Sequence, residues 1–238
     1  MPQRWDSAAR LRAEQIERGL DLTFSNVFVP YFQSQLRRLK PTSVLEVGGG
    51  TGHLCKSLCT LSANYVVVEP SAGMFDVARA VLSSHPARLL KETLDSFVTR
   101  GERFDAVISH MCVQTVEDLD GFCRGVALSL HPSATYLISL PHPAFYNQYK
   151  SFFEPERFRY IEECSREVSF AVTLDPSREI SGVPYYHRPI GRYVSALAQA
   201  GLYVSGFDEI FPKPETQALY GQPWKDPRYL VLAGGLFP

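Results

Sequence analysis

A glycine-rich loop is the clearest place in this sequence for binding chemistry. Residues 46–52 read Glu-Val-Gly-Gly-Gly-Thr-Gly and separate a short apolar segment, SVLEV, from a segment with an apolar helical face. Glycine lacks a Cβ, so it permits positive φ and lets a ligand approach the backbone closely. Free amides at the start of the following helix attract a carboxylate or another anion. We therefore expect a ligand site at this loop, where a strand of an open α/β sheet ends.

A carboxylate follows at the end of the next apolar segment. Glu69 closes YVVVEP, and an acid placed about 20 residues after such a loop binds ribose hydroxyls in nucleotide-binding sheets. The dinucleotide pattern G-x-G-x-x-G would need a glycine at position 53, where this chain has His53. The spacing is instead E-x-G-x-G-x-G. This departure disfavours a nicotinamide-dependent oxidoreductase but leaves it open.

Three histidines stand next to predicted strand or helix ends. His110 follows FDAVIS, His142 follows ATYLISL, and His187 precedes a predicted helix. A positioned imidazole can act as a general base and contribute about 10²- to 10⁴-fold to a rate. The alternative for each is a structural role in fixing a turn or bracing a helix. The other histidines are interpreted as surface or capping residues: His53, His85 and His131.

Strand and helix patterns alternate along the chain and would position these residues. Apolar segments typical of strands occupy 43–47, 65–70, 87–90, 104–109, 134–140, 202–207 and 228–234. Helical spacing of apolar residues predicts helices over 26–39, 53–62, 72–84, 117–130 and 190–200. Such alternation is typical of a parallel sheet covered on both faces. We predict an α/β fold, Rossmann-like and doubly wound, with a mostly parallel seven-stranded sheet and an antiparallel last strand.

The alternation breaks between Pro141 and Pro189. A period-2 run, VSFAVTL, and a second extended piece ending in VPYYH are separated by DPSR, which predicts a β-hairpin with its turn at that sequence. Residues 141–189 are therefore interpreted as a β-arm or lid inserted into a single domain, 1–238. Residues 1–40 are expected to form an N-terminal helical cap. The hairpin could also serve as a dimer arm, so an oligomer stays open.

Aromatic residues of the insertion could cover a small ligand or form a small core of their own. As a lid they would favour an apolar or aromatic ligand. Tyr31, in the helical cap, could also close over the site. The candidate ligand-facing rings of the insertion are Phe145, Tyr146, Tyr185 and Tyr186.

Composition and charge exclude several classes of function. The 24 Lys plus Arg balance 25 Asp plus Glu, so the electrostatic basis for nucleic-acid binding is missing. No run of 18 apolar residues exists, and the first twenty residues lack the apolar core of a signal peptide, so neither a membrane span nor secretion is expected. We predict a cytoplasmic protein. Its five cysteines are interpreted as buried reduced thiols, and the histidine and cysteine spacings predict no metal site.

The loop and strand motifs resemble those of a known family. VLEVGGGTGHL followed by VVVEPS is similar to the nucleotide-binding half of class I S-adenosylmethionine-dependent methyltransferases. The order of FDAVIS, ATYLISL and the final strand pair matches as well, so the resemblance covers nearly the whole chain. It implies S-adenosylmethionine as cofactor, S-adenosylhomocysteine as product, and methyl transfer to an oxygen or nitrogen of a small molecule.

The resemblance also implies roles for individual residues around the methionine and ribose. Gly48, Gly50 and Gly52 would line the methionine portion of the cofactor, with Glu46 orienting the loop or the amino group. Glu69 would hold the ribose diol. The remaining cofactor residues would lie near the adenine or the sulfonium. Those near the adenine are Met74, Thr93, Leu94 and Asp95, and Pro70, directly after Glu69, is a further cofactor-binding residue. Those near the sulfonium are Ser109 and His110.

Two short motifs resemble a small-molecule subset of this family. SLPHPAF carries His142 in a His-Pro after the fifth strand, and YYHRPIGRYVSAL carries His187 in a Tyr-His-Arg-Pro before the last long helix. The resemblance makes both candidates for the base or for orienting the acceptor, with His110 as a third. A member that binds the cofactor without catalysing methyl transfer, as a partner subunit or a catalyst of another reaction, stays an alternative.

Overall fold

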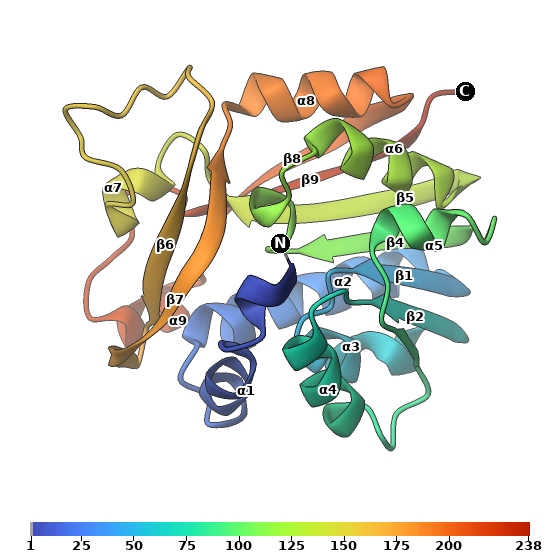
Figure 1. Ribbon diagram of the computed structural model, residues 1–238, viewed down its shortest axis with the longest axis horizontal. Coiled ribbons are helices and arrows are strands. Elements are labelled where there is room, and N and C mark those ends of the chain that lie inside the picture. The colour runs from blue at the N-terminus through green and yellow to red at the C-terminus, as the bar shows by residue number, and fades with distance from the viewer. Residues whose placement is uncertain (1) are drawn as a thin grey trace.

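The computed structural model describes residues 2–238. Within them, seven strands form one sheet in the order β3-β2-β1-β4-β5-β9-β8, and β6 and β7 form a separate two-stranded sheet (Figure 1). The strands are β1 (Ser43–Val47), β2 (Asn64–Val68), β3 (Arg88–Leu90), β4 (Phe104–His110), β5 (Leu130–Pro141), β6 (Cys164–Val172), β7 (Asp175–His187), β8 (Leu202–Ile210) and β9 (Tyr229–Leu236).

Helices connect these strands. They are α1 (Ala9–Glu17), α2 (Val29–Leu39), α3 (His53–Leu58), α4 (Ala72–Val81), α5 (Leu94–Val98), α6 (Leu119–Leu128), α7 (Tyr146–Lys150), α8 (Ile190–Gln199) and α9 (Pro214–Gln217). Shorter helical segments are η1 (Pro2–Trp5), η2 (Phe24–Phe28, π-helical), η3 (Cys59–Leu61), η4 (Val113–Thr115) and η5 (Ala218–Tyr220).

The pairing of the strands confirms the predicted doubly wound sheet. β3, β2, β1, β4 and β5 are parallel to their neighbours, whereas β9 runs antiparallel to both β5 and β8. The central strands are mostly apolar because helices bury both of their faces. Val44 packs in the core on the side of α2, α3 and α4, and the next residue, Leu45, packs on the side of α5, α6 and α8. Figure 1 shows these two helical layers on opposite sides of the sheet.

Side-chain caps set where several helices begin. The Ser71 hydroxyl accepts a hydrogen bond from the Met74 amide and caps α4, as its position before the helical pattern predicts. Asp118 caps α6 by accepting from the Gly121 amide. That helix is therefore shorter than the predicted 117–130, and β5 begins directly after it at Leu130.

The inserted hairpin differs from the prediction in the position of its turn. The turn lies at Thr173 and Leu174, and Asp175 is already paired with Val172, so DPSR belongs to the start of β7. Contacts with the N-terminal segment fix this register. The Leu174 amide donates to the Leu20 carbonyl, and the Gln15 side-chain amide donates to Asp175. Pro176 is tolerated because a two-stranded sheet leaves each strand an unpaired edge.

The N-terminal helices lie across the end of the sheet. η1 and α1 contact both α4 and β7, so they occupy the space between the first half of the sheet and the hairpin (Figure 1). Within residues 2–238, no helix is long and apolar enough to cross a membrane. The same residues contain no group of three His, Cys, Asp or Glu side chains that could hold a metal ion. Cys112 and Cys164 are partly exposed, contrary to the prediction that all five thiols are buried.

Candidate active site

A cavity of about 440 Å³ opens where β1, β2 and β4 end. Its inner part is lined by the glycine loop and by the segments that follow β2 and β3. Its outer part is lined by α7 and the inner face of the β6–β7 hairpin, and the N-terminal segment contributes to both parts. The cavity therefore lies at the carboxyl edge of the parallel strands, where sheets of this kind bind ligands.

The glycine loop presents its backbone to this cavity. Gly48 and Gly50 have φ of 69° and 55°, a region that L-residues with a side chain rarely adopt. A Cβ on Gly50 would meet no atom within 4 Å, so the position opens into free space beside the loop. A Cβ on Gly48 would collide with the Cys112 side chain instead. Both glycines line the cavity, so contact with the methionine portion of a cofactor stays a prediction.

Gly52 does not line the cavity, and this corrects its predicted role. A Cβ there would stand 3.1 Å from the Ala78 Cβ and 3.2 Å from Leu82 Cδ1. The residue also has φ of 77° and precedes the first residue of α3. Gly52 therefore lets α3 pack closely against α4, which shapes the loop without touching a ligand.

Glu69 is held at the loop by two backbone amides. Its Oε1 accepts from the Ser71 amide and its Oε2 from the Gly50 amide, each over 2.8 Å. The side chain is only 6% exposed, and this burial raises the pKa of Glu69 although both amide bonds lower it. Each carboxylate oxygen retains a lone pair, so the group can accept two further hydrogen bonds from a ligand.

Glu46 lines the cavity from the end of β1. The Tyr65 hydroxyl donates to its Oε2 over 2.7 Å. Burial raises the pKa of Glu46 to about 8, and the nearby charge of Glu69 adds to this. The carboxyl group is thus protonated at neutral pH unless a cation comes to lie beside it.

The residues predicted for the adenine side line the cavity together, as does Pro70. Thr93 caps α5 by accepting from the Ser96 amide, which brings the start of that helix to the cavity. All five predicted residues are part of the lining: Pro70, Met74, Thr93, Leu94 and Asp95. Ser109 is not, because its hydroxyl is fully buried and donates to the Val47 carbonyl between β4 and β1.

His110 is the candidate base that the structure places in the cavity. Its Nδ1 lies 2.8 Å from Ser139 Oγ, and its ring packs against Phe28 with centroids 4.5 Å apart. Burial lowers the pKa of His110 to about 3, with a further contribution from the positive charge of Arg12. The imidazole is therefore neutral over the physiological range.

His142 lies outside the cavity lining. It is 1% exposed, its Nδ1 accepts from the Ala144 amide, and its protonated Nε2 donates to Glu209 Oε1 over 3.1 Å. Phe145 stacks near its ring, with centroids 4.7 Å apart, and is also outside the lining. Both ring nitrogens are occupied, so this placement argues for a structural role in joining β5 to β8.

His187 is likewise held away from the cavity. Its Nε2 donates to the Tyr160 carbonyl over 2.9 Å, and its ring packs against Phe158 at 4.7 Å. The adjacent Arg188 donates to the carbonyls of Val116 and Glu117. The Tyr-His-Arg-Pro motif therefore braces the junction between the hairpin and α8.

The candidate aromatic residues divide into two groups. Tyr146 and Tyr185 line the outer cavity, with roughly parallel rings 6.5 Å apart between centroids. Tyr31 and Tyr186 do not. The Tyr31 hydroxyl donates to Asp208 over 2.5 Å, and the Arg188 guanidinium stacks on the Tyr186 ring.

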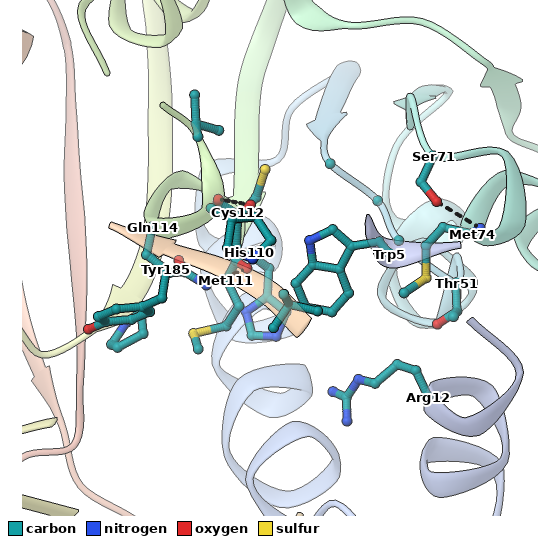
Figure 2. A pocket seen from close by; sticks show the side chains of 18 of the residues that line it. Trp5, Arg12, Thr51, Ser71, Met74, His110, Met111, Cys112, Gln114 and Tyr185 are labelled. Atoms are coloured by element: carbon teal, nitrogen blue, oxygen red, sulfur yellow. Dashed lines mark hydrogen bonds between the residues drawn. The ribbon is translucent and has the colours of Figure 1, made fainter. Parts of the chain in front are cut away.

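The N-terminal segment supplies cavity residues that the sequence did not reveal. Figure 2 shows Trp5 between Met74 and His110, with its indole extending into the cavity. Arg12 lies below it and forms an ion pair with Asp21 over 2.6 Å. Nothing in the local pattern of residues 2–21 indicates these contacts, because they depend on how the segment folds back over the sheet.

His53 was interpreted as a surface or capping residue; it does lie at a helix end, but it is buried in the cavity wall. Its Nδ1 lies 2.9 Å from Thr51 Oγ1, and Nε2 lies 3.5 Å from a carboxylate oxygen of Glu17. His53 is the first residue of α3, and the fold of α1 over that helix end buries it. His53, the residue that departs from the dinucleotide pattern, therefore lies in the wall of the cavity.

Comparison with known proteins finds a methyltransferase domain in part of the chain. Residues 45–138 match the family model of a methyltransferase domain, and the fold is shared by solved S-adenosylmethionine-dependent methyltransferases. The chain carries a methyltransferase domain, and its fold is that of such S-adenosylmethionine-dependent structures. One such structure, from Clostridium acetobutylicum, has a TM-score of 0.69 at 14% identity and covers 98% of this chain and 99% of its own. A glycopeptide N-methyltransferase complexed with S-adenosylmethionine has a TM-score of 0.61 at 17% identity, covering 87% of both chains.

Curated relatives share part of the sequence of this chain. A ubiquinone biosynthesis O-methyltransferase of Azorhizobium caulinodans is 27% identical over 141 residues, which cover 57% of this chain and 56% of that protein. The chain thus spans about half the length of the curated relatives it matches. Because the alignment covers only about half of each chain, the relatives do not by themselves define the acceptor.

The residues of the methyltransferase site fit S-adenosylmethionine. Free space beside Gly50 and two remaining lone pairs on Glu69 suit a methionine chain and a ribose diol. Glu46 is a buried carboxyl whose ionisation an ammonium group would favour. Gln114 Oε1 lines the cavity, buried and without a hydrogen-bond donor among the described residues, so it could accept from a bound molecule. These acceptor groups therefore match the hydroxyl and ammonium donors of the cofactor.

Proposed function

We propose that this methyltransferase transfers a methyl group from S-adenosylmethionine to an oxygen or nitrogen of a small-molecule acceptor and releases S-adenosylhomocysteine. The observation that carries this proposal is the continuity of one cavity. It runs from the glycine loop, where the cofactor residues lie, to the rings of Tyr146 and Tyr185 under the hairpin. A small acceptor bound between those rings would lie next to the cofactor.

The proposed roles of the chain follow from placement and exclusion of water. S-adenosylmethionine supplies a methyl group on a positively charged sulfur, which is already an activated leaving group. Glu69 and the glycine loop would hold the cofactor, and the outer rings would align the acceptor for in-line attack. The N-terminal segment, with Trp5, would limit access of water to the reacting atoms.

His110 is the residue we propose to orient the acceptor or remove its proton. It is a neutral imidazole in the cavity lining, and Ser139 fixes its ring through Nδ1. The other two predicted histidines have their observed hydrogen bonds elsewhere. The wall near His110 is aromatic, with Phe24 and Phe28 at ring-centroid distances of 5.9 and 4.5 Å. These surroundings favour an apolar or aromatic acceptor.

Relatives named ubiquinone biosynthesis O-methyltransferase favour oxygen as the acceptor atom. Two alternatives to the proposed methyl transfer can be tested. A protein that binds the cofactor without transferring methyl would have the same glycine loop, because that loop reports binding alone. A nicotinamide-dependent oxidoreductase is disfavoured, since His53 replaces the third glycine of the dinucleotide pattern.

Calorimetric titration with S-adenosylmethionine, S-adenosylhomocysteine and NADH tests cofactor choice. We expect micromolar binding of the two sulfur compounds and none of NADH. Transfer of a labelled methyl group to a panel of phenols, amines and carboxylic acids then tests catalysis. Binding of NADH alone would overturn the proposal, and cofactor binding without transfer to any acceptor would favour the non-catalytic alternative.

The variant Gly50→Val tests the placement of the cofactor. A Cβ-branched side chain would occupy the free space beside the loop, so we expect at least about a tenfold loss of S-adenosylmethionine affinity. Gly101→Val is the matched control. Gly101 also has positive φ, 70°, and open space around its Cβ position, but it lies outside the cavity. Equal S-adenosylmethionine affinities of Gly50→Val and Gly101→Val would show that the cofactor does not bind at this loop.

A further inference from the structure

Lys150 brings a positive charge into the outer cavity. It is the last residue of α7 and lines the cavity beside the hairpin. Its ammonium donates one hydrogen bond, to the Ala171 carbonyl over 2.8 Å. An ammonium has three donors, and no carboxylate of the described residues lies within ion-pair distance of this one.

A second cation, Arg228, packs on the Tyr149 ring, which the Lys150 ammonium also contacts. The Arg228 guanidinium stands 3.7 Å from the centroid of the Tyr149 ring and 4.4 Å from that of Trp224. The Lys150 ammonium lies 4.7 Å from the centroid of Tyr149. Among residues 2–238, Arg228 also forms no ion pair with a carboxylate. Burial and repulsion from Arg228 together lower the pKa of Lys150.

The nearby acidic groups do not neutralise this pair of cations. Asp21 lines the cavity, but it is bound by the Arg12 guanidinium at 2.6 Å and by the Phe24 amide at 3.0 Å. Glu179 also acts on Lys150 at longer range, and its side chain is exposed to solvent, which screens its charge. A cation in a partly dry cavity without a counter-charge is unfavourable and gains most from an anionic ligand.

We infer that the acceptor is a small aromatic or apolar acid whose carboxylate binds the Lys150 ammonium. The inference rests on the proposed methyl transfer and specifies its substrate class. Phe152, Phe170 and Tyr185 line the same part of the cavity and would contact the apolar body of the acid. The positive charge of Arg228, which packs on the Tyr149 ring, would strengthen the electrostatic attraction of the carboxylate without contacting it.

Two ligands that differ in charge at one group test this inference. The probes are 3,4-dihydroxybenzoate and 3,4-dihydroxybenzamide, which share the ring and both hydroxyls. Calorimetric titration into the protein saturated with S-adenosylhomocysteine should give about tenfold tighter binding of the carboxylate than of the amide. In Lys150→Met this preference should fall to about one, whereas Lys150→Arg should retain it.

Lys213→Met is the matched control, because Lys213 is exposed and lies outside the cavity. It should keep the wild-type preference. Equal binding of both probes to the wild type, or no binding of either at millimolar concentration, would overturn the inference even if Lys150→Met failed to fold. An unchanged preference in Lys150→Met would overturn it as well. Failure of the wild type to bind S-adenosylhomocysteine at the start would instead overturn the proposed function.

Discussion

The Asp6 carboxylate accepts a hydrogen bond from the Ser71 hydroxyl over 2.6 Å, and the same oxygen accepts from the Gly73 amide over 3.0 Å. These bonds attach the N-terminal segment to the start of α4. Ser71 also donates its amide to Glu69, the proposed ribose ligand. The segment that carries Trp5 into the cavity is thus anchored to Ser71, the same residue whose amide holds the Glu69 carboxylate.

Gly73→Ala should weaken cofactor binding through this anchor. A Cβ at Gly73 would collide with the backbone of Asp6, so the N-terminal segment must move away from α4. We expect about a tenfold loss of S-adenosylmethionine affinity by calorimetry. Gly191→Ala is the control: Gly191 is likewise the second residue of its helix, and a Cβ there meets nothing within 4 Å. Helix propensity favours alanine in both, so only contact with Asp6 separates them. Unchanged affinity in Gly73→Ala would show that the anchor does not matter for binding.

The inner half of the site could be predicted from the sequence because its signals are local. A loop glycine with positive φ, a capping serine and an acid at a strand end each lie within a few residues of the element that they serve. Gly50, Glu69 and Ser71 were identified in this way. The direction in which a side chain points after a strand is not local information. His110 and His142 each follow a strand, yet one faces the cavity and the other faces β8.

The N-terminal contribution could not be predicted for a related reason. Asp6 and Ser71 are far apart in the sequence, and their contact exists only once α1 packs between α4 and the hairpin. The turn of the hairpin was predicted at the wrong residues for the same reason, because its position depends on contacts with a segment distant in the sequence. DPSR has a strong turn composition, but the bonds of Leu174 and Asp175 to the N-terminal segment move the turn to Thr173 and Leu174.

Glu46→Gln should change how stability depends on pH. The folded-state pKa of Glu46 is raised from 4.5 to about 8, so between these values the folded protein binds a proton that the unfolded chain does not. Wild-type stability therefore falls as pH rises from about 5 to 8, by roughly 3 to 4 kcal/mol if the cofactor is absent. Glutamine can still accept from the Tyr65 hydroxyl and cannot ionise. Urea unfolding at pH 5, 6.5 and 8 should show this fall in the wild type and a smaller one in the variant. If the free energy of unfolding changed equally with pH in the wild type and in Glu46→Gln, the raised pKa of Glu46 would be contradicted.

His110→Asn should lower turnover while preserving the cofactor site. The residue lines the cavity but bonds to Ser139 and not to the glycine loop. If it handles the acceptor's proton, we expect kcat to fall about 10²- to 10⁴-fold with S-adenosylmethionine affinity unchanged. Because burial lowers the pKa of His110 to about 3, acidification from pH 7 to pH 5 should not protonate it in the free enzyme. A loss of kcat/KM centred near pH 6.5 in the wild type that disappears in His110→Asn would contradict the lowered pKa of His110.

His142→Ala should act on stability and leave chemistry intact. Removing the ring breaks its hydrogen bonds to Ala144 and Glu209 and leaves a buried space against Phe145. We expect the free energy of unfolding to fall by about 1 to 3 kcal/mol, from lost hydrogen bonds and packing. His131→Ala, at an exposed position, should change it by less than about 0.5 kcal/mol. At a temperature where both variants are folded, turnover per folded molecule should equal that of the wild type. A large loss of kcat in folded His142→Ala would show that His142 takes part in the reaction. Its hydrogen bond to Glu209 would then have to break when the acceptor binds.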